Sequence, residues 1–303
     1  MLGVYKFRKV FFLFVLSVLF LGVFWGRANA ANQDLTVSPP SFNLVVQPGQ
    51  TYSGSFEVIN QGSETYHFIV YSEPYSVVGE TYSPDFEPVS GTPDISSWFK
   101  FSTTDKTLIP GQSTNIGYSI SVPPKTLSEG YYAVAFAQTE NPQADVQGVT
   151  INERVGSLFF LQVGGNVVKK GSLLSWSSSF LQKPPLSSTL KIEDNGSIHF
   201  IAKYSYKVSD IFGSAKFVIN GEKILLPQTI RQISLVWQKS PSFGLYKVNG
   251  SVSFLNQTHN LDTKYVLVMS TNAKVYSLVF IVCLLVIFIL FTTIKRRRNK
   301  HKK

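Results

Sequence analysis

Residues that carry out chemistry are few in this sequence, and their spacing builds no familiar reactive site. Between the two apolar chain ends the histidines are His67, His199 and His259, which lie far apart. The single cysteine, Cys283, lies in an apolar run near the C-terminus. A zinc site needs several closely placed ligands, and a cysteine nucleophile needs a base. We therefore expect no metal site, and we interpret His199 as a histidine that caps a turn by hydrogen bonds.

The carboxylates also fail to suggest a catalytic pair. Glu193 and Asp194 are neighbours, but neighbouring residues of a strand point to opposite faces and cannot flank one bond. GxSxG, Walker and EF-hand motifs are absent from the sequence. We expect no cofactor and no catalytic residue, while a glycosidase-like pair assembled from separate loops stays open.

One long segment with little strand alternation collects acidic and aromatic residues. It covers 72–97 and reads SEPYSVVGETYSPDFEPVSGTPDISS. Carboxylates accept hydrogen bonds and aromatic rings supply contact area, so such a loop suits basic or sugar-containing partners. The candidate partner-binding residues are Tyr75, Glu80, Tyr82, Asp85, Phe86 and Glu87. An ordinary connection between strands is the alternative, and an exposed sheet edge that accepts a partner's strand is a second candidate site.

The elements that must position these residues are predicted to be strands. Apolar and polar residues alternate in five segments: 51–60, 116–122, 198–206, 233–237 and 246–254. Period two indicates a strand with one buried face. In the turn sequences QPGQ and IPGQ, proline presets φ, and Gly49 and Gly111 are expected at positive φ. We expect an all-β protein with two immunoglobulin-like antiparallel β-sandwich domains plus one C-terminal transmembrane helix.

The N-terminus has the composition of a signal peptide. Basic residues before position 10 precede an apolar stretch, and the small residues ANA at 28–30 fit a signal peptidase site. We predict a signal peptide over 1–30, with cleavage between Ala30 and Ala31. An uncleaved signal anchor is the alternative, and it also leaves the following domains outside the cell.

The C-terminus is predicted to be a membrane anchor. Residues 275–294 contain no charge, and a helix of this length is about as long as a bilayer core is thick. The basic tail, 295–303, then stays in the cytoplasm. A buried helix of a soluble domain is the alternative, but it would be expected to show polar positions. The expected protein is a single-pass cell-membrane protein with an extracellular N-terminal ectodomain.

Charge divides this expected ectodomain into two halves. Residues 31–168 contain thirteen acidic and four basic residues, whereas 169–274 contain five acidic and thirteen basic ones. The shift predicts an acidic sandwich over 31–168 and a basic one over 169–270. The basic half either docks on the acidic half or faces the anionic membrane and wall polymers, and solvated faces of different sign are the alternative. Because the net charge of residues 31–274 is near zero, nucleic acid is not an expected partner.

The order of these motifs resembles a known family. VSPPSFNLVVQPGQTYSGSFEVIN, LIPGQSTNIGYSISVP, SEGYYAVAFA and RVGSLFFLQVGG precede a second predicted sandwich with IEDNGSIHF and FGLYKV, an apolar segment and a basic tail. This arrangement is similar to the WxL-interacting cell-surface proteins of Gram-positive bacteria. The resemblance implies a membrane-anchored protein whose distal domain contacts peptidoglycan or a surface protein, and whose proximal domain contacts host or matrix material. The chain would be the interacting partner rather than the wall-bound protein, because it contains no Trp-x-Leu motif. Other residues follow each of its tryptophans: Trp25, Trp98, Trp176 and Trp237.

Two functions fit these features. The first is a membrane-anchored cell-surface binding or scaffold protein, without chemistry of its own, whose sandwiches contact peptidoglycan or a surface protein. The alternative is a membrane-tethered extracytoplasmic chaperone or assembly factor that holds exported proteins by strand donation. A long apolar edge strand would favour the chaperone, whereas an enzyme would need convergent polar side chains in one pocket.

Overall fold

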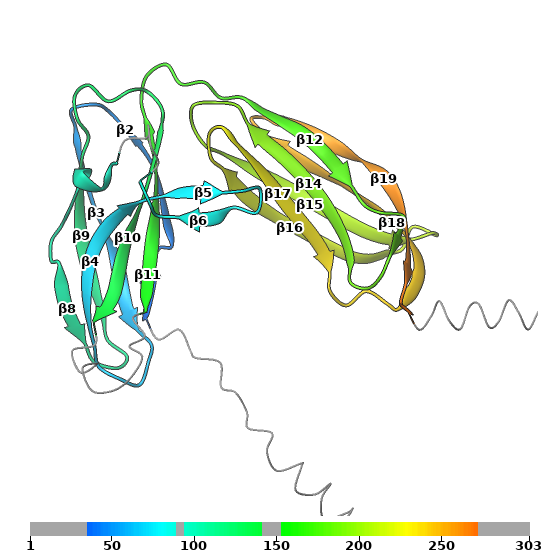
Figure 1. The fold of residues 1–303 in the computed structure, drawn as a ribbon, viewed down its shortest axis with the longest axis horizontal. Helices are drawn as coiled ribbons and strands as arrows, with labels where there is room; N and C mark the ends of the chain where they lie inside the picture. The colour runs from blue at the N-terminus through cyan, green and yellow to red at the C-terminus, as the bar shows by residue number, and fades with distance from the viewer. Residues whose placement is uncertain (1–34, 89–93, 141–152, 272–303) are drawn as a thin grey trace, which may run out of the picture.

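The chain folds into two β-sandwiches that meet at an angle (Figure 1). The structure, a computed structural model, describes residues 35–88, 94–140 and 153–271. The predicted all-β fold is confirmed for these ranges. The predicted signal peptide with its cleavage site at Ala30 and Ala31, the predicted transmembrane helix and the basic tail lie outside the described residues. Within the described part of the chain, no helix is long and apolar enough to cross a membrane.

The first sandwich consists of two sheets. Its elements are β1 Leu35–Ser38, β2 Ser41–Val46, β3 Thr51–Asn60, β4 Tyr66–Pro74, η1 (a 3-10 helix) Ser96–Trp98, β7 Phe99–Phe101, β8 Asp105–Leu108, β9 Ser113–Ser121, β10 Gly130–Glu140 and β11 Arg154–Val163. One sheet has the order β1-β3-β9-β7 and the other β2-β11-β10-β4-β8. The first two strands belong to different sheets, and β2 runs parallel to β11. This strand order corresponds to an immunoglobulin-type sandwich.

The second sandwich repeats this plan. Its strands are β12 Gly171–Ser177, β13 Leu181–Gln182, β14 Leu186–Asp194, β15 Phe200–Asp210, β16 Ala215–Leu225, β17 Thr229–Trp237, β18 Phe243–Phe254 and β19 Gln257–Met269. They form sheets of order β12-β14-β17 and β13-β19-β18-β15-β16. Here too the first two strands lie in different sheets, and β13 runs parallel to β19.

Each sandwich buries its own hydrophobic core. In the first, Phe56, Phe68 and Phe159 are almost completely buried. In the second, Tyr206 is buried at the centre, and its hydroxyl forms a hydrogen bond with Ser188. The predicted boundary near Val168 lies in the segment between β11 and β12.

The predicted strands and turns are present with one shift. The alternating segments correspond to β3, β9, β15, β17 and β18. Gly49 and Gly111 have φ of +79° and +74°, as the turn sequences predict. β15 begins two residues after the predicted start at Ile198, because the carboxylate of Asp194 accepts the N–H of Gly196 and the chain bends there.

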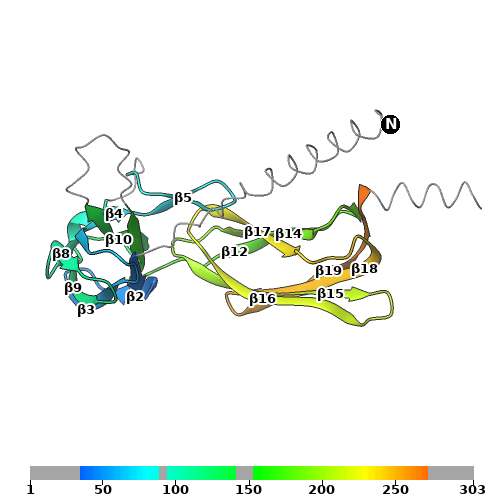
Figure 2. The ribbon, with the colours of Figure 1, turned by 90° about the horizontal axis from the view of Figure 1, so that it is seen from below.

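A small third sheet links the two sandwiches. β5 Ser76–Val78 pairs with β6 Ser83–Asp85 in an antiparallel hairpin. Its sequence lies in the segment that shows little alternation, yet the hairpin projects from the first sandwich to the second (Figures 1 and 2). We call it the bridging hairpin, residues 76–85.

A substitution at Gly250 tests the close packing of β18 against β15. A Cβ at this position would lie 2.1 Å from the backbone oxygen of Ser205. Because a backbone oxygen cannot rotate away, Gly250→Ala should lower the free energy of unfolding by about 1–3 kcal/mol. Gly221→Ala is the control, since a Cβ there meets the hydroxyl of Tyr204, which can swing aside. Urea denaturation followed by tryptophan fluorescence measures both, and equal losses would contradict the expectation.

Candidate functional site

The predicted partner-binding loop lies at the junction of the two sandwiches. A hydrophobic cluster separate from both cores contains Tyr82 of the bridging hairpin, Phe160 of β11 and Leu226 of the second sandwich. Tyr75 packs against the same cluster, and its ring lies edge-on to Phe160. The loop therefore joins parts of the chain that are far apart in sequence.

Tyr82 is the central contact of this junction. Its hydroxyl accepts the N–H of Leu226 at 3.0 Å and forms a hydrogen bond with the hydroxyl of Thr229. The guanidinium of Arg231 lies 4.1 Å from the centroid of its ring. Burial raises the pKa of Tyr82, which keeps the hydroxyl neutral. Its φ of +62° costs a residue with a side chain about 1–2 kcal/mol, and these contacts compensate for that cost.

Glu80 holds the tip of the bridging hairpin on the second sandwich. Its carboxylate forms an ion pair with Lys191 of β14. Its backbone carbonyl accepts the N–H of Gln232 at 2.7 Å. Gln232 lies in β17, an edge strand of its sheet. The ion pair is partly exposed and contributes about 0–1 kcal/mol, but the backbone bond covers part of the β17 edge.

His199 makes a second polar connection between the sandwiches. Its backbone N–H donates to the hydroxyl of Tyr132 at 3.0 Å, and its Nε2 lies 3.1 Å from Oδ1 of Asn43. An amide oxygen only accepts, so we place the proton on Nε2. Nδ1 then accepts the hydroxyl hydrogen of Tyr132, 3.2 Å away. The interpretation of His199 as a histidine that caps a turn by hydrogen bonds is therefore wrong, because its side chain binds two strands of the first sandwich.

The charge state of His199 follows from its surroundings. Burial, with a smaller effect of Lys169, lowers the pKa of His199 to about 4. The imidazole is therefore neutral at neutral pH, as the hydrogen bonds to Asn43 and Tyr132 require.

Asp194 is a buried carboxyl group beside the junction. Its Oδ1 accepts the N–H of Gly196 at 2.8 Å, while Oδ2 has no hydrogen-bond partner among the described residues. Burial raises the pKa of Asp194 to about 7, because the charged form loses water without gaining a cation. The group therefore titrates near neutral pH.

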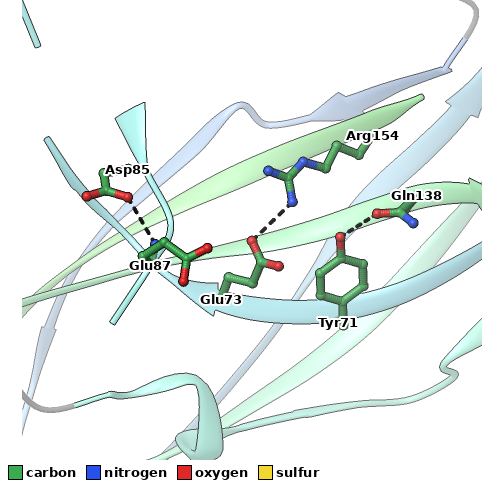
Figure 3. Close-up of polar contacts among 6 residues, drawn as sticks. All are labelled: Tyr71, Glu73, Asp85, Glu87, Gln138 and Arg154. Atoms are coloured by element: carbon green, nitrogen blue, oxygen red, sulfur yellow. Dashed lines mark hydrogen bonds and ion pairs between the residues drawn. The ribbon is translucent and has the colours of Figure 1, made fainter. Parts of the chain in front are cut away.

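Arg154 contacts the chain on both sides of the bridging hairpin and holds it on the first sandwich. Its Nη1 lies 3.2 Å from Oε2 of Glu73 (Figure 3). Its guanidinium lies 4.4 Å from the ring centroid of Phe136 and 5.0 Å from that of Phe86. Hydrogen bonding to Tyr71 and the nearby Glu73 carboxylate raise the pKa of Arg154. Arg154 is therefore a permanent cation between two aromatic rings.

The remaining acidic residues of the predicted site lie on the solvent side of this contact. The carboxylate of Asp85 accepts the N–H of Glu87 at 3.1 Å, and Glu87 is exposed (Figure 3). On the other side of the Glu73–Arg154 pair, the hydroxyl of Tyr71 donates to Gln138 at 2.6 Å (Figure 3). This surface belongs to the first sandwich.

The structure thus divides the six predicted residues. Glu80 and Tyr82 contact the second sandwich. Tyr75 lies at the junction cluster, where its ring contacts Phe160 of the first sandwich and Phe86. Phe86 contacts Phe136 of the first sandwich, and Asp85 and Glu87 are its neighbours in the chain. Binding of an outside partner by this loop stays a prediction. Tyr82, which is 7% exposed, has its contacts within the chain.

Sequence reasoning missed the residues that receive the loop and His199. Asn43 lies in β2, Tyr132 lies in β10, and Thr229 and Arg231 both lie in β17. Each is an ordinary strand residue in its local pattern. No signal in the sequence near these positions pointed to the junction, because the partners meet only in the folded chain.

The second candidate site is an exposed sheet edge, and the structure shows that β16 is an edge strand. β16 pairs with β15 on one side and ends its sheet on the other. At 11 residues it is the longest edge strand of the sheets within the described ranges. Its central residues, 217–221, contain no charge and no proline.

The side chains of β16 leave the core open at this edge. Phe217 and Ile219 pack on the second core but stay partly exposed. Val218 points to the other face and is 51% exposed. Natural edge strands are often shortened, charged, bulged, interrupted by proline or covered. The centre of β16 has none of these protections, but Lys216 and a register shift precede it, and Glu222 and Lys223 follow it.

The histidines and carboxylates of the described residues form no metal-binding cluster. Among the described residues, no three or more histidine, cysteine, aspartate and glutamate side chains lie close enough to hold a metal ion. His67 lies 3.2 Å from the hydroxyl of Thr107, and His259 stacks on Phe254.

Comparisons with known proteins assign no family. No family model matches the chain, and no curated protein matches it. Solved structures with a partial likeness include the E. coli chaperone DraB, at 13% identity and a TM-score of 0.36, over 77% of this chain and 96% of that one. Another is the Salmonella enterica SafA pilin in complex with the SafB chaperone, at 9% identity and 0.37, over 79% and 99%. A third is the class 5 fimbriae chaperone CfaA, at 12% and 0.36, over 78% and 99%. Likeness at these scores carries no conclusion for this chain, and the resemblance to WxL-interacting proteins stays a prediction.

Removing the hydroxyl of Tyr82 tests the junction. Tyr82→Phe leaves the buried N–H of Leu226 without its acceptor, so the free energy of unfolding should fall by about 1–3 kcal/mol. Tyr265→Phe is the matched control, since Tyr265 is exposed on β19. Urea denaturation measures both variants. The same small change in the two variants would show that the Tyr82 hydroxyl does not stabilise the junction.

Asp194 and His199 should change the stability of the protein with pH in opposite directions. The unfolded chain releases the proton of Asp194 near pH 4, while the folded chain keeps it to about pH 7, so stability falls as the pH rises between these values. Between pH 6.5 and about pH 4, His199 is protonated in the unfolded chain but neutral in the folded chain. The stability of the protein therefore falls as the pH drops through this range.

Asp194→Asn should remove the first effect alone. Relative to the unmodified chain, the variant should become progressively more stable as the pH rises from 4 to about 7. Urea denaturation at a series of pH values measures this difference. Parallel stability profiles would exclude Asp194 as the titrating group.

Proposed function

We propose that this protein is an extracytoplasmic assembly factor that holds another exported protein by accepting one of its strands at the edge of β16. The observation that carries the proposal is the edge of β16, an 11-residue strand that is paired on one side. Its uncharged centre, 217–221, has no strand beside it on the other side, while the carbonyl of Ile224 near its end accepts a hydrogen bond from Arg231. Its position outside the cell rests on the predicted signal peptide and anchor. The protein acts through binding and performs no chemistry of its own.

Strand addition explains the side chains at this edge. The unpaired N–H and C=O groups of β16 supply main-chain hydrogen bonds, which bind an extended segment of almost any sequence. Selectivity comes from the side chains. A partner strand with alternating apolar residues would extend the core beyond Phe217 and Ile219 and cover the surface that they leave open.

The junction supports the same role. The tip of the bridging hairpin covers β17 through the bond between Glu80 and Gln232, so that edge is partly occupied. β16 therefore stays the long edge that is open in the second sandwich. Contacts of Tyr82 and His199 with the opposite sandwich keep the first domain in place beside it.

A wall-binding scaffold is the competing function, and one feature favours it. A hollow of about 400 Å³ in the second sandwich is lined mainly by hydroxyl groups: Ser177, Ser178, Ser179, Ser187, Ser188 and Thr189, with Leu181, Gln182 and Lys183. Such a surface suits a carbohydrate. The amide of Gln182, however, is already bonded to Ser178 and Ser187, which leaves fewer free groups for a ligand. We therefore prefer strand binding.

Proline substitutions at two neighbouring positions of β16 test strand addition. In an antiparallel ladder the N–H groups of Val218 and Ile219 point to opposite sides, one to β15 and one outward. A photo-crosslinking residue at the exposed Asn220 should capture a partner protein in intact cells. Two variants are compared, Val218→Pro and Ile219→Pro. The variant that keeps the melting temperature of the unmodified chain has lost only the outward N–H. This variant should abolish the adduct.

Control positions and a polymer test separate the two functions. A crosslinker at Val45, which is exposed on β2, should not give the same adduct. An adduct at Asn220 that persists in the stable proline variant contradicts strand addition. Retention of the purified chain on peptidoglycan at physiological salt, with no adduct at Asn220, would establish the scaffold instead.

A further inference from the structure

One end of the second sandwich lies away from the first sandwich (Figure 1). Exposed apolar side chains gather at this end. Phe212 is 89% exposed and Phe243 is 58% exposed. They belong to one end of the sheet, because Asp210 of β15 lies opposite Tyr246 of β18 and Phe243 lies opposite Met269, the last residue of β19. Ile211 and Leu245 add further exposed apolar surface. We call this surface the distal apolar end, residues 211–212 and 243–245.

Lysines surround this end. Lys183 and Lys239 are exposed in the connections beside it, and Lys247 lies on β18. The nearby acid, Asp210, is already paired with Lys216 at 3.0 Å. The surroundings of the distal apolar end are therefore basic, unlike the first sandwich.

The chain leaves the second sandwich at this same end (Figures 1 and 2). β19 ends at Met269, and the N–H of Ser270 is bonded to the carbonyl of Ser242. The uncharged segment 275–294 begins four residues after Thr271. Four residues span at most about 14 Å. If 275–294 crosses the membrane, Thr271 is held within that distance of the bilayer, and the neighbouring Ser242–Phe243 segment of the distal apolar end lies beside it.

We propose that the distal apolar end docks on an anionic lipid bilayer. Phe212 and Phe243 enter the interface between headgroups and acyl chains, where aromatic rings are favoured. Lys183, Lys239 and Lys247 face the negative headgroups. A second copy of the chain would bring like charges together, whereas an anionic bilayer complements them. The docking depends on the predicted anchor and is independent of strand binding at β16.

Lipid-depth fluorescence on the full-length chain tests this docking. In a Cys283→Ser background, Ser242→Cys places a single environment-sensitive label beside Phe243, and Ile109→Cys places one on the first sandwich. Both proteins are inserted in vesicles of phosphatidylcholine with phosphatidylglycerol. The label at 242 should shift to shorter wavelength and be quenched by lipids that carry a nitroxide in the acyl chain. The label at 109 should report water.

Two further variants separate the apolar and basic contributions. Phe212→Ser with Phe243→Ser should remove the quenching at 242. Lys183→Gln with Lys239→Gln should lower the ratio of docked to undocked protein by roughly five-fold per lysine, and phosphatidylcholine alone should have a similar effect. Emission at 242 that matches emission at 109 in anionic vesicles would overturn the proposal. Quenching that is equal in neutral lipid and unaffected by the lysine changes would overturn its electrostatic part.

Discussion

Polar groups buried between the two sandwiches must find their partners across the junction, and this requirement fixes how the halves meet. The N–H of Leu226 has its acceptor in the hydroxyl of Tyr82, which belongs to the other domain. The imidazole of His199 is likewise satisfied by Asn43 and Tyr132. Because an unmade buried hydrogen bond costs about 1–3 kcal/mol, a small rotation of one sandwich against the other would break several bonds at a combined cost.

The junction determines which edges of the second sandwich remain open. The bridging hairpin reaches β17 and the end of β16, where Ile224 packs against the cluster around Tyr82, and it leaves the centre of β16 without a neighbouring strand. One contact region within the chain therefore both orients the domains and selects the candidate binding edge. The distal apolar end lies away from this junction (Figure 1). The proposed contacts with the membrane and with an exported protein therefore use separate surfaces of the same domain.

The fold was predictable because its signals are local. Alternation places Phe56 and Val58 inward along one strand, and the Pro-Gly turns place Gly49 and Gly111 at positive φ. The junction was not predictable in the same way. The acidic and aromatic loop attracted attention by its composition, but Tyr82 contacts Thr229, nearly 150 residues later, and no local pattern records that distance. Burial of Asp194 likewise depends on packing that the sequence does not display.

The distance between the two sandwiches is the measurement that tests the locked junction most directly. Spin labels at Ile109→Cys and Ser242→Cys, in the full-length chain with Cys283→Ser, report it by pulsed electron paramagnetic resonance. The contacts of Tyr82 and His199 predict one narrow distance distribution, which Tyr82→Ala should broaden. A broad distribution in the chain that keeps Tyr82, or no change in the variant, would contradict a fixed junction.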